Sequence, residues 1–235
     1  MKLLALDTST EYLSLCLWLD GVAHTRNLLA GQSHSQQILP LLREILTEAK
    51  LELGDLDYIA FGAGPGSFTG LRIGCGVAQG LAFGANLPVV AVSTLQALAQ
   101  GAMTKDPTAV RIIACLDARM GEVYHAAYIR NGECWDEISA PGLYKPEAIP
   151  TLPGEGWVGA GSGWSAYGDA LKHGYAKQII STMPEEYPNA TAIAALSLPM
   201  FAAGLGVAAA QAAPIYIRNK VALKTSEREA GLRFN

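Results

Sequence analysis

The hydrophobic and polar positions at the start of the chain alternate in a way that predicts three consecutive β-strands. A short apolar run over residues 3–6 ends at Asp7, and a second run over 13–19 alternates toward Asp20-Gly21. That dipeptide is typical of a tight hairpin turn, so residues 22–29 are expected to return beside the second strand.

The next segment changes to a helical period. After Ser33, apolar residues recur three or four positions apart and mark one face of a helix: Ile38, Leu41, Leu42, Ile45, Leu46 and Ala49. Pro40 lies within this pattern and predicts a late helix start or a kink. The pattern then predicts a strand over 57–61, a helix over 69–84, a strand over 87–92, and a helix from the capping box Ser93-Thr94-Leu95-Gln96 toward Met103.

The second half of the chain repeats the beginning of the first. Residues 111–116 form a strand-like run that ends at Asp117, and Asn131-Gly132 is a hairpin signal between alternating segments over 122–129 and 133–138. Beyond Pro141 the pattern weakens. It predicts a strand over 157–159, an Ala-rich helix over 191–213 interrupted by Pro199 and Gly204, an extended stretch over 215–218 and a frayed tail over 224–235.

This order of elements predicts the fold class. Three strands, a helix, a strand and a helix, given twice with an acid after each first strand, are typical of the α/β actin-like, sugar-kinase and Hsp70 superfamily. Its members consist of two RNase H-like lobes with ATP bound between them. We therefore expect a first lobe over 1–104 and a second, reduced lobe with a C-terminal helix and tail over 105–235.

The densest motif is the glycine-rich stretch over 62–74, between a predicted strand and a predicted helix. Its glycines permit positive φ or close backbone approach, and Thr69 is a candidate N-cap. It is not a Walker loop, because no Gly-Lys-Ser/Thr follows, and it lacks the spacing of a dinucleotide fingerprint. A phosphate-binding loop and a purely structural turn both remain open.

Composition and charge narrow the function classes. Half of the residues are hydrophobic, and the net charge is −4 with scattered basic residues, so independent binding of nucleic acid is not expected. The four cysteines lie far apart, without metal-ligand spacing, and are expected to be reduced. We see no signal peptide or apolar stretch of about 20 residues, so a cytoplasmic protein without a membrane segment is expected.

Several motifs together resemble the TsaB (YeaZ) family. They are Leu4-Ala5-Leu6-Asp7-Thr8-Ser9, the stretch from Gly64 to Gly74, Pro88 to Leu95, Asp117 to Tyr124, and Pro214-Ile215-Tyr216-Ile217-Arg218-Asn219. The resemblance implies a bacterial component of the machinery that makes threonylcarbamoyladenosine (t6A) at position 37 of tRNAs. In that family TsaB pairs with its paralogue TsaD, which transfers the threonylcarbamoyl group, and the ATPase TsaE joins them.

The residues argue against catalysis by this chain alone. A phosphate loop in the second lobe needs glycines after its acid, whereas Asp117-Ala118-Arg119-Met120-Gly121 places three side chains there. The catalytic paralogue carries two metal-binding histidines four apart, at positions that correspond here to Thr94 and Leu98. We therefore expect no catalytic residue, no metal site and no cofactor bound by this chain alone. The degenerate phosphate-loop positions are Asp7, Thr8, Ser9, Asp117 and Arg119.

Other candidate residues have two interpretations each. Asp7 either caps a turn, which we favour, or orients water or a metal-bound phosphate. His34 is favoured as a helix-start residue over a base, and an ion pair among Asp117, Arg119 and Glu122 is favoured over an acid/base cluster. The aromatic residues Tyr124, Tyr128 and Trp135 are favoured as packing residues over base-stacking ones.

The helix after the glycine stretch is the better functional candidate. Its five glycines form two stripes, Gly70 with Gly74 and Gly76 with Gly80 and Gly84, and each costs about 1 kcal/mol relative to alanine. Close approach of another helix explains them, and that helix belongs either to this chain or to a partner. The resemblance favours a partner, because first-lobe helices in the TsaB family meet their counterparts on TsaD or on a second TsaB. The expected interface residues are Ile38, Leu42, Ile45, Gly70, Arg72, Ile73, Gly74, Val77, Gly80, Leu81 and Gly84.

The leading hypothesis is a non-catalytic subunit that binds and activates TsaD, helps recruit TsaE, forms a homodimer without TsaD and meets tRNA only through the complex. A small-molecule kinase or ATPase of the same fold is the first alternative. A metallopeptidase is the second, and the absent histidine pair argues against it.

Overall fold

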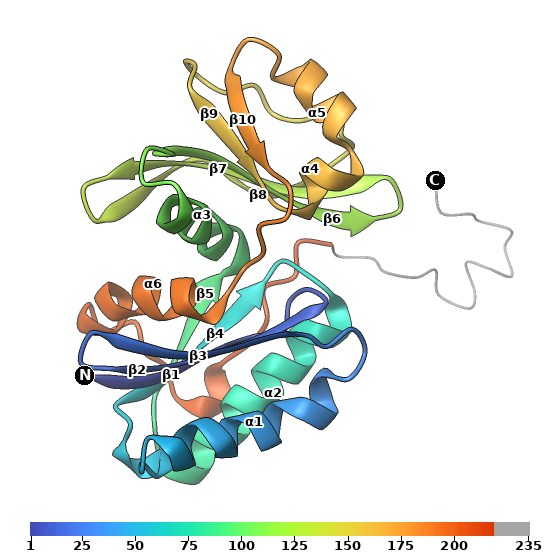
Figure 1. Cartoon of the computed structure of the whole chain (residues 1–235). Coiled ribbons are helices and arrows are strands. Elements are labelled where there is room, and N and C mark those ends of the chain that lie inside the picture. The colour runs from blue at the N-terminus through green and yellow to red at the C-terminus, as the bar shows by residue number, and fades with distance from the viewer. Residues whose placement is uncertain (219–235) are drawn as a thin grey trace, which may run out of the picture.

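The computed structural model describes residues 1–218, which form two lobes with a five-stranded sheet in each (Figure 1). The predicted tail over 224–235 lies outside the described residues. The N-terminal end of the chain lies in the first lobe, and α3 and α6 lie between the two sheets. The two-lobed α/β fold predicted from the sequence is confirmed.

The first sheet has the order β3-β2-β1-β4-β5. Its strands are β1 (Lys2–Asp7), β2 (Tyr12–Leu19), β3 (Val22–Leu29), β4 (Tyr58–Gly64) and β5 (Val89–Ser93). The first three are antiparallel neighbours, whereas β4 runs parallel to β1 and β5 parallel to β4. Asp20 and Gly21 form the predicted hairpin turn, with φ of 48° and 100°.

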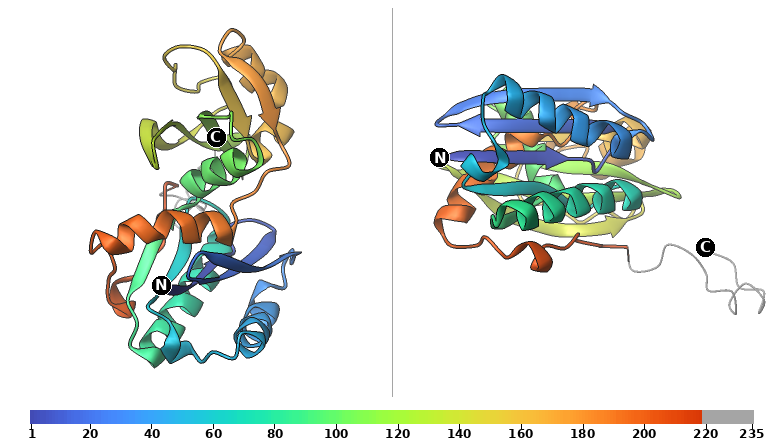
Figure 2. Two further views of the ribbon diagram at one scale, coloured as in Figure 1. Left: turned by 60° about the vertical axis from the view of Figure 1, so that its left-hand side comes forward. Right: turned by 90° about the horizontal axis from the view of Figure 1, so that it is seen from below.

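Two helices cover one face of this sheet, α1 (His34–Glu48) and α2 (Phe68–Ala85), and the short 3-10 helix η1 (Leu53–Asp55) precedes β4 (Figure 2). The predicted late start of α1 is wrong, because the helix begins six residues before Pro40. Pro40 and Gln36 both lie on the exposed side of α1, so water can reach the carbonyl that loses its intrahelical donor. The N-cap of α2 is Ser67 instead of the predicted Thr69, since the Ser67 hydroxyl accepts a bond from the Gly70 amide (3.4 Å).

The second sheet has the order β10-β9-β6-β7-β8, so β6 takes the place that β1 has in the first. Its strands are β6 (Arg111–Arg119), β7 (Glu122–Asn131), β8 (Cys134–Tyr144), β9 (Trp157–Ala160) and β10 (Ile179–Met183). The short helices α4 (Ser162–Ala166) and α5 (Gly168–Gly174) connect β9 to β10. The sequence pattern predicted neither these two helices nor β10. Between β8 and β9 the chain forms no helix, although α1 lies at the equivalent point of the first lobe. The second lobe is reduced in this way.

The remaining helices, α3 (Thr94–Lys105) and α6 (Ala190–Ala202), pack against each other between the sheets. Ser93 caps α3 as predicted, through a bond from the Gln96 amide (3.4 Å). The helix α3 contacts the second sheet, and α6, from the second half of the chain, contacts the first. One apolar core cluster therefore includes residues of both sheets, such as Leu3 and Ile112.

The chain after α6 returns along the first lobe. The predicted helix over 191–213 is shorter in the structure, because it ends at Ala202, before Gly204 with its φ of 76°. A 3-10 turn, η2 (Ala209–Gln211), follows, and residues 212–218 belong to neither sheet. Among the helices of the described residues, none combines the length and apolar character needed to cross a bilayer.

Candidate functional site

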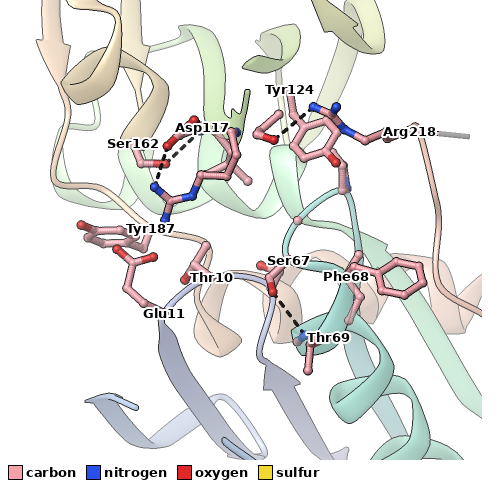
Figure 3. Close-up of a pocket in the computed structure, with 18 of the residues that line it drawn as sticks. Thr10, Glu11, Ser67, Phe68, Thr69, Asp117, Tyr124, Ser162, Tyr187 and Arg218 are labelled. Atoms are coloured by element: carbon pink, nitrogen blue, oxygen red, sulfur yellow. Dashed lines mark hydrogen bonds and ion pairs between the residues drawn. The ribbon is translucent and has the colours of Figure 1, made fainter. Parts of the chain in front are cut away.

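A cleft of about 950 Å³ lies between the two lobes (Figure 3). The first lobe contributes the loop after β1 and the N-terminal end of α2, and the second contributes the β6–β7 turn and the start of α4. Figure 3 shows Glu11 and Tyr187 at one end of the cleft and Phe68 and Arg218 at the other. Polar side chains of both lobes therefore face a shared space.

Asp7, at the end of β1, is buried, with 1% of its surface exposed. Its Oδ1 accepts hydrogen bonds from the Ser9 amide and hydroxyl (3.0 and 2.8 Å), whereas its Oδ2 has no partner among the residues that the structure describes. Burial raises the pKa of this carboxyl to about 6, because loss of water disfavours the ionised form. Ser9 lines the cleft and Asp7 does not, so the geometry is that of a turn cap.

The β6–β7 turn is the segment where the sequence predicts a degenerate second phosphate loop. Arg119, Met120 and Gly121 have φ of 61°, 57° and 74°, a left-handed conformation that is strained for the first two. Asp117 Oδ2 pairs with the exposed Arg119 guanidinium (3.0 Å), and Asp117 Oδ1 accepts a bond from the Arg119 amide (2.8 Å). The ion pair favoured from the sequence is present, and the carboxylate is already engaged within its own turn.

The glycines of α2 divide into two sets with different surroundings. A Cβ on Gly70 would lie 1.9 Å from the Thr8 carbonyl oxygen, and one on Gly74 would lie 2.5 Å from the Thr8 hydroxyl. Both glycines are buried and allow close approach of the chain's own β1–β2 loop. They therefore do not belong to the exposed interface that the sequence predicted. A Cβ on any glycine of the other stripe would meet no atom of residues 1–218 within 4 Å, and those glycines are exposed: Gly76, Gly80 and Gly84.

An open groove of about 530 Å³ runs between the outer faces of α1 and α2. We call it the α1–α2 groove. Its α2 side consists of Arg72, Ile73, Gly76, Val77, Gly80 and Leu81. On the α1 side Leu39 is 53% exposed, and Ile38 contributes although its side chain is buried. Leu42 and Ile45, also expected at an interface, are instead core residues beneath α1, at 3% and 1% exposure.

Comparison with known proteins gives the family. A model of the family described as "TsaD: tRNA N6-adenosine threonylcarbamoyltransferase" matches residues 28–230. The Escherichia coli (strain K12) protein named tRNA threonylcarbamoyladenosine biosynthesis protein TsaB is 44% identical over 95% of this chain and 97% of its own length. The protein of the same name from Haemophilus influenzae is 40% identical, over 95% and 96%. This chain belongs to the TsaB family.

Solved structures agree with this assignment. The structure described as YeaZ from Pseudomonas aeruginosa is 38% identical and superposes with a TM-score of 0.80, covering 92% of this chain and 99% of that one. A Pseudomonas aeruginosa protein described as similar to peptidase YEAZ gives a TM-score of 0.86 at 39% identity, with the same coverage. The resemblance to the TsaB (YeaZ) family inferred from the motifs is confirmed.

In this TsaB-family chain the two positions expected to replace a metal-binding histidine pair face inward. Thr94 donates a hydrogen bond from its hydroxyl to the Pro65 carbonyl, and Leu98 is fully buried in the core shared by the lobes. Within residues 1–218, His, Cys, Asp and Glu side chains form no group of three that could hold a metal ion.

The ambiguous histidine and aromatic residues are buried in this member of the TsaB family. His34 begins α1, is 5% exposed and contacts the Tyr12 carbonyl through Nε2 (3.2 Å). Trp135 is 9% exposed and donates from Nε1 to Gln100 (2.9 Å). Tyr128 is buried as well, so the interpretation as packing residues holds for Trp135 and Tyr128, whereas Tyr124 is 8% exposed and also lines the cleft.

The sequence interpretation missed a surface cluster at the N-terminal end of α2. The Arg72 guanidinium lies 3.9 Å from the centre of the Phe68 ring, and Arg72 Nε donates to the Tyr216 hydroxyl (3.2 Å). The rings of Phe68 and Tyr216 are 5.3 Å apart. Arg72 and Tyr216 are 144 positions apart, so no local sequence pattern links them. The sequence indicates this cluster only through Phe68, an exposed aromatic residue at the start of a helix.

Proposed function

We propose that this chain is a non-catalytic subunit required for t6A modification at position 37 of tRNA, and that it binds and activates TsaD and helps recruit TsaE. The α1–α2 groove is the observation that carries this proposal. An exposed apolar groove with bare glycines indicates that another surface covers it, because soluble proteins rarely expose large apolar patches without a function. Family membership supports TsaD, a second chain of related fold, as the partner.

The groove fits a helix of such a partner. Gly76, Gly80 and Gly84 leave a stripe without side chains, so a partner helix can approach the α2 backbone closely. Val77 and Leu81 flank that stripe and provide apolar contact. Because TsaD and this chain share an architecture, the same face can pair with TsaD or, in its absence, with a second copy of this chain.

The rest of the molecule fits a role without chemistry of its own. Asp117 is engaged by Arg119, and Thr94 and Leu98 pack inward where the catalytic paralogue has histidines. We infer that no cofactor binds to this chain alone and that the complex works in the cytoplasm. With a net charge of −4, the chain meets tRNA only through the complex.

The experiment replaces a groove glycine and measures association with TsaD. Gly80→Leu adds a side chain in open space, so the fold should be retained, while the added isobutyl group blocks helix approach. We expect at least a tenfold loss of TsaD affinity and of homodimer formation, by sedimentation velocity and titration calorimetry, with an unchanged circular dichroism spectrum.

Gly168→Leu is the matched control, because a Cβ there also meets nothing within 4 Å but lies on α5 of the second lobe. Its affinity for TsaD should equal that of the unaltered chain. Equal affinity of Gly80→Leu and Gly168→Leu for TsaD would show that the α2 glycines have a purely structural role. Tight binding of ATP to the isolated chain, in the same calorimeter, would support a kinase or ATPase instead.

A further inference from the structure

Residues 212–218 connect the lobes at the end of the cleft away from the crossover between β10 and α6. Tyr187, in that crossover, lies at one end of the cleft, and Arg218 lies at the other (Figure 3). The two direct passages of the chain between the lobes are the loops after α3 and after β10. Residues 212–218 therefore form a third link between the lobes.

The first lobe holds the beginning of this segment along α2 and β4. The Ala212 carbonyl accepts a bond from Gln79 (2.8 Å), and the Ile215 amide donates to the Ala63 carbonyl (2.7 Å). A Cβ on Gly64, whose φ is 123°, would lie 2.5 Å from the Ile215 carbonyl oxygen. One residue of the glycine stretch is thus needed for the segment to lie so close to β4.

The second lobe holds the end of the segment through Arg218. Its Nη2 lies 2.6 Å from Glu122 Oε2 and donates to the Ala118 carbonyl (3.1 Å). Its Nη1 lies 3.5 Å from the Met120 sulfur. The Arg218 side chain is 13% exposed and that of Glu122 27%, so this charged pair is shielded from solvent more than an ordinary surface pair.

The same segment reaches the α1–α2 groove. Tyr216 holds Arg72, which lines the groove, while Phe68 lies under the Arg72 guanidinium and also lines the cleft. Arg72 of the groove therefore contacts Tyr216. Tyr216 lies two residues before Arg218, which contacts the β6–β7 turn.

We propose that residues 212–218 act as a strap that holds the lobes closed and couples the α1–α2 groove to the width of the cleft, with Arg218 as its contact on the second lobe. The coupling to a partner rests on the proposed function; the closure of the lobes does not. Because coupling between two sites is reciprocal, occupation of the groove should also favour the closed cleft.

The test measures the distance between the lobes in single molecules. Fluorophores are attached through Thr47→Cys on α1 and Lys172→Cys on α5, both exposed, with the exposed Cys134 replaced by Ser. Labelled chains are observed at high dilution, so that energy transfer occurs within one molecule. We expect one high-transfer population for the unaltered strap and a second, lower-transfer population for Arg218→Ala.

Arg119→Ala is the matched control, since this arginine also lines the cleft but, within residues 1–218, pairs only with Asp117 of its own lobe. It should leave the distance distribution unchanged. If Arg218→Ala fails to fold by circular dichroism, Glu122→Gln weakens the same contact from the other side and should also open the lobes. A distribution for a folded strap variant identical to that of Arg119→Ala would overturn the strap.

A second measurement tests the coupling. TsaD should bind Arg218→Ala at least threefold more weakly than it binds Arg119→Ala, and saturating TsaD should shift the labelled chains toward high transfer. Opening of the lobes with unchanged TsaD affinity would overturn the coupling but keep the strap. If the unaltered chain does not bind TsaD at all, the proposed function fails while the distance measurement still decides the strap.

Discussion

Asp7 has an unusual environment for a carboxylate. Its Oδ2 is buried without a partner above Gly62, where a Cβ would lie 1.9 Å away, and its pKa is raised to about 6 by burial. An ionised group in such a position costs stability, because the unfolded chain exposes it to water. Asp7 thus orders the loop after β1 through Ser9 at a cost to the folded state.

This environment predicts a pH-dependent gain for Asp7→Asn. The folded pKa lies above the usual value of 3.8, so the penalty is absent below about pH 4, grows through pH 6 and is complete at neutral pH. Two pKa units correspond to about 3 kcal/mol. Urea unfolding should show Asp7→Asn to be more stable than the unaltered chain at pH 7 by up to about that amount, with a much smaller difference at pH 4. A difference that does not change with pH would contradict the raised pKa.

His125 is a second buried ionisable group, with a pKa lowered to about 4 by burial. Its Nε2 contacts the Tyr175 hydroxyl (2.8 Å), and its Nδ1 has no partner in the described part of the chain. Because its folded pKa lies below 6.5, this residue contributes stability that is lost as the pH falls from 6.5 toward 4. Asp7 and His125 therefore act in opposite directions over the same pH range, so the comparison of Asp7→Asn is made against the unaltered chain at each pH.

At the scale of elements, α2 has two faces with different requirements. The inner face needs glycine at positions 70 and 74 because the β1–β2 loop lies against the helix backbone, with the Thr8 hydroxyl bonded to the Gly70 carbonyl (2.7 Å). The outer face has glycine at positions where a Cβ would meet no atom of the described residues within 4 Å. The sequence places these glycines in two stripes but could not show which stripe is buried, since all five glycines have helical spacing.

A pair of alanine substitutions tests this difference. Gly74→Ala should destabilise the fold by about 1–3 kcal/mol, because its methyl group overlaps the Thr8 hydroxyl. Gly76→Ala, two residues later in the same helix, should stabilise it by about 0.5–1 kcal/mol through helix propensity alone. Chemical denaturation gives both values. Equal effects of the two substitutions would show that α2 does not approach the β1–β2 loop as described.

Local pattern predicted the strands and α-helices of the first lobe because each carries its own signal, whereas η1 was not predicted. The hairpin dipeptide Asp20-Gly21 set β2 and β3, and the capping serine set the start of α3. The segment between β9 and α6 gave no such signal, since α4 and α5 have five and seven residues and β10 has no buried residue. The buried role of Leu42 and Ile45 follows from packing on the sheet, and an apolar helix face alone does not reveal which surface covers it.

At the scale of the whole molecule, the exchange of α3 and α6 between the sheets makes the lobes depend on each other. Tyr58 of β4 meets Ser197 of α6 through their hydroxyls (2.9 Å) and stacks on Phe201, with the ring centres 4.1 Å apart. A shared core on one side and the proposed strap on the other leave the cleft between them. No sequence motif could give this arrangement, because its contacts join residues 139 and 100 positions apart.

The central claim is that this chain supports the modification through the α1–α2 groove without performing the transfer itself. The most direct measurement is t6A formation on tRNA by purified TsaD and TsaE, supplied with threonylcarbamoyl-adenylate and ATP, with and without this chain. We predict modification with the unaltered chain and with Gly168→Leu, and at least a tenfold lower yield without the chain or with Gly80→Leu at equal concentration. Equal yield with and without the chain, or full activity of Gly80→Leu, would contradict the account.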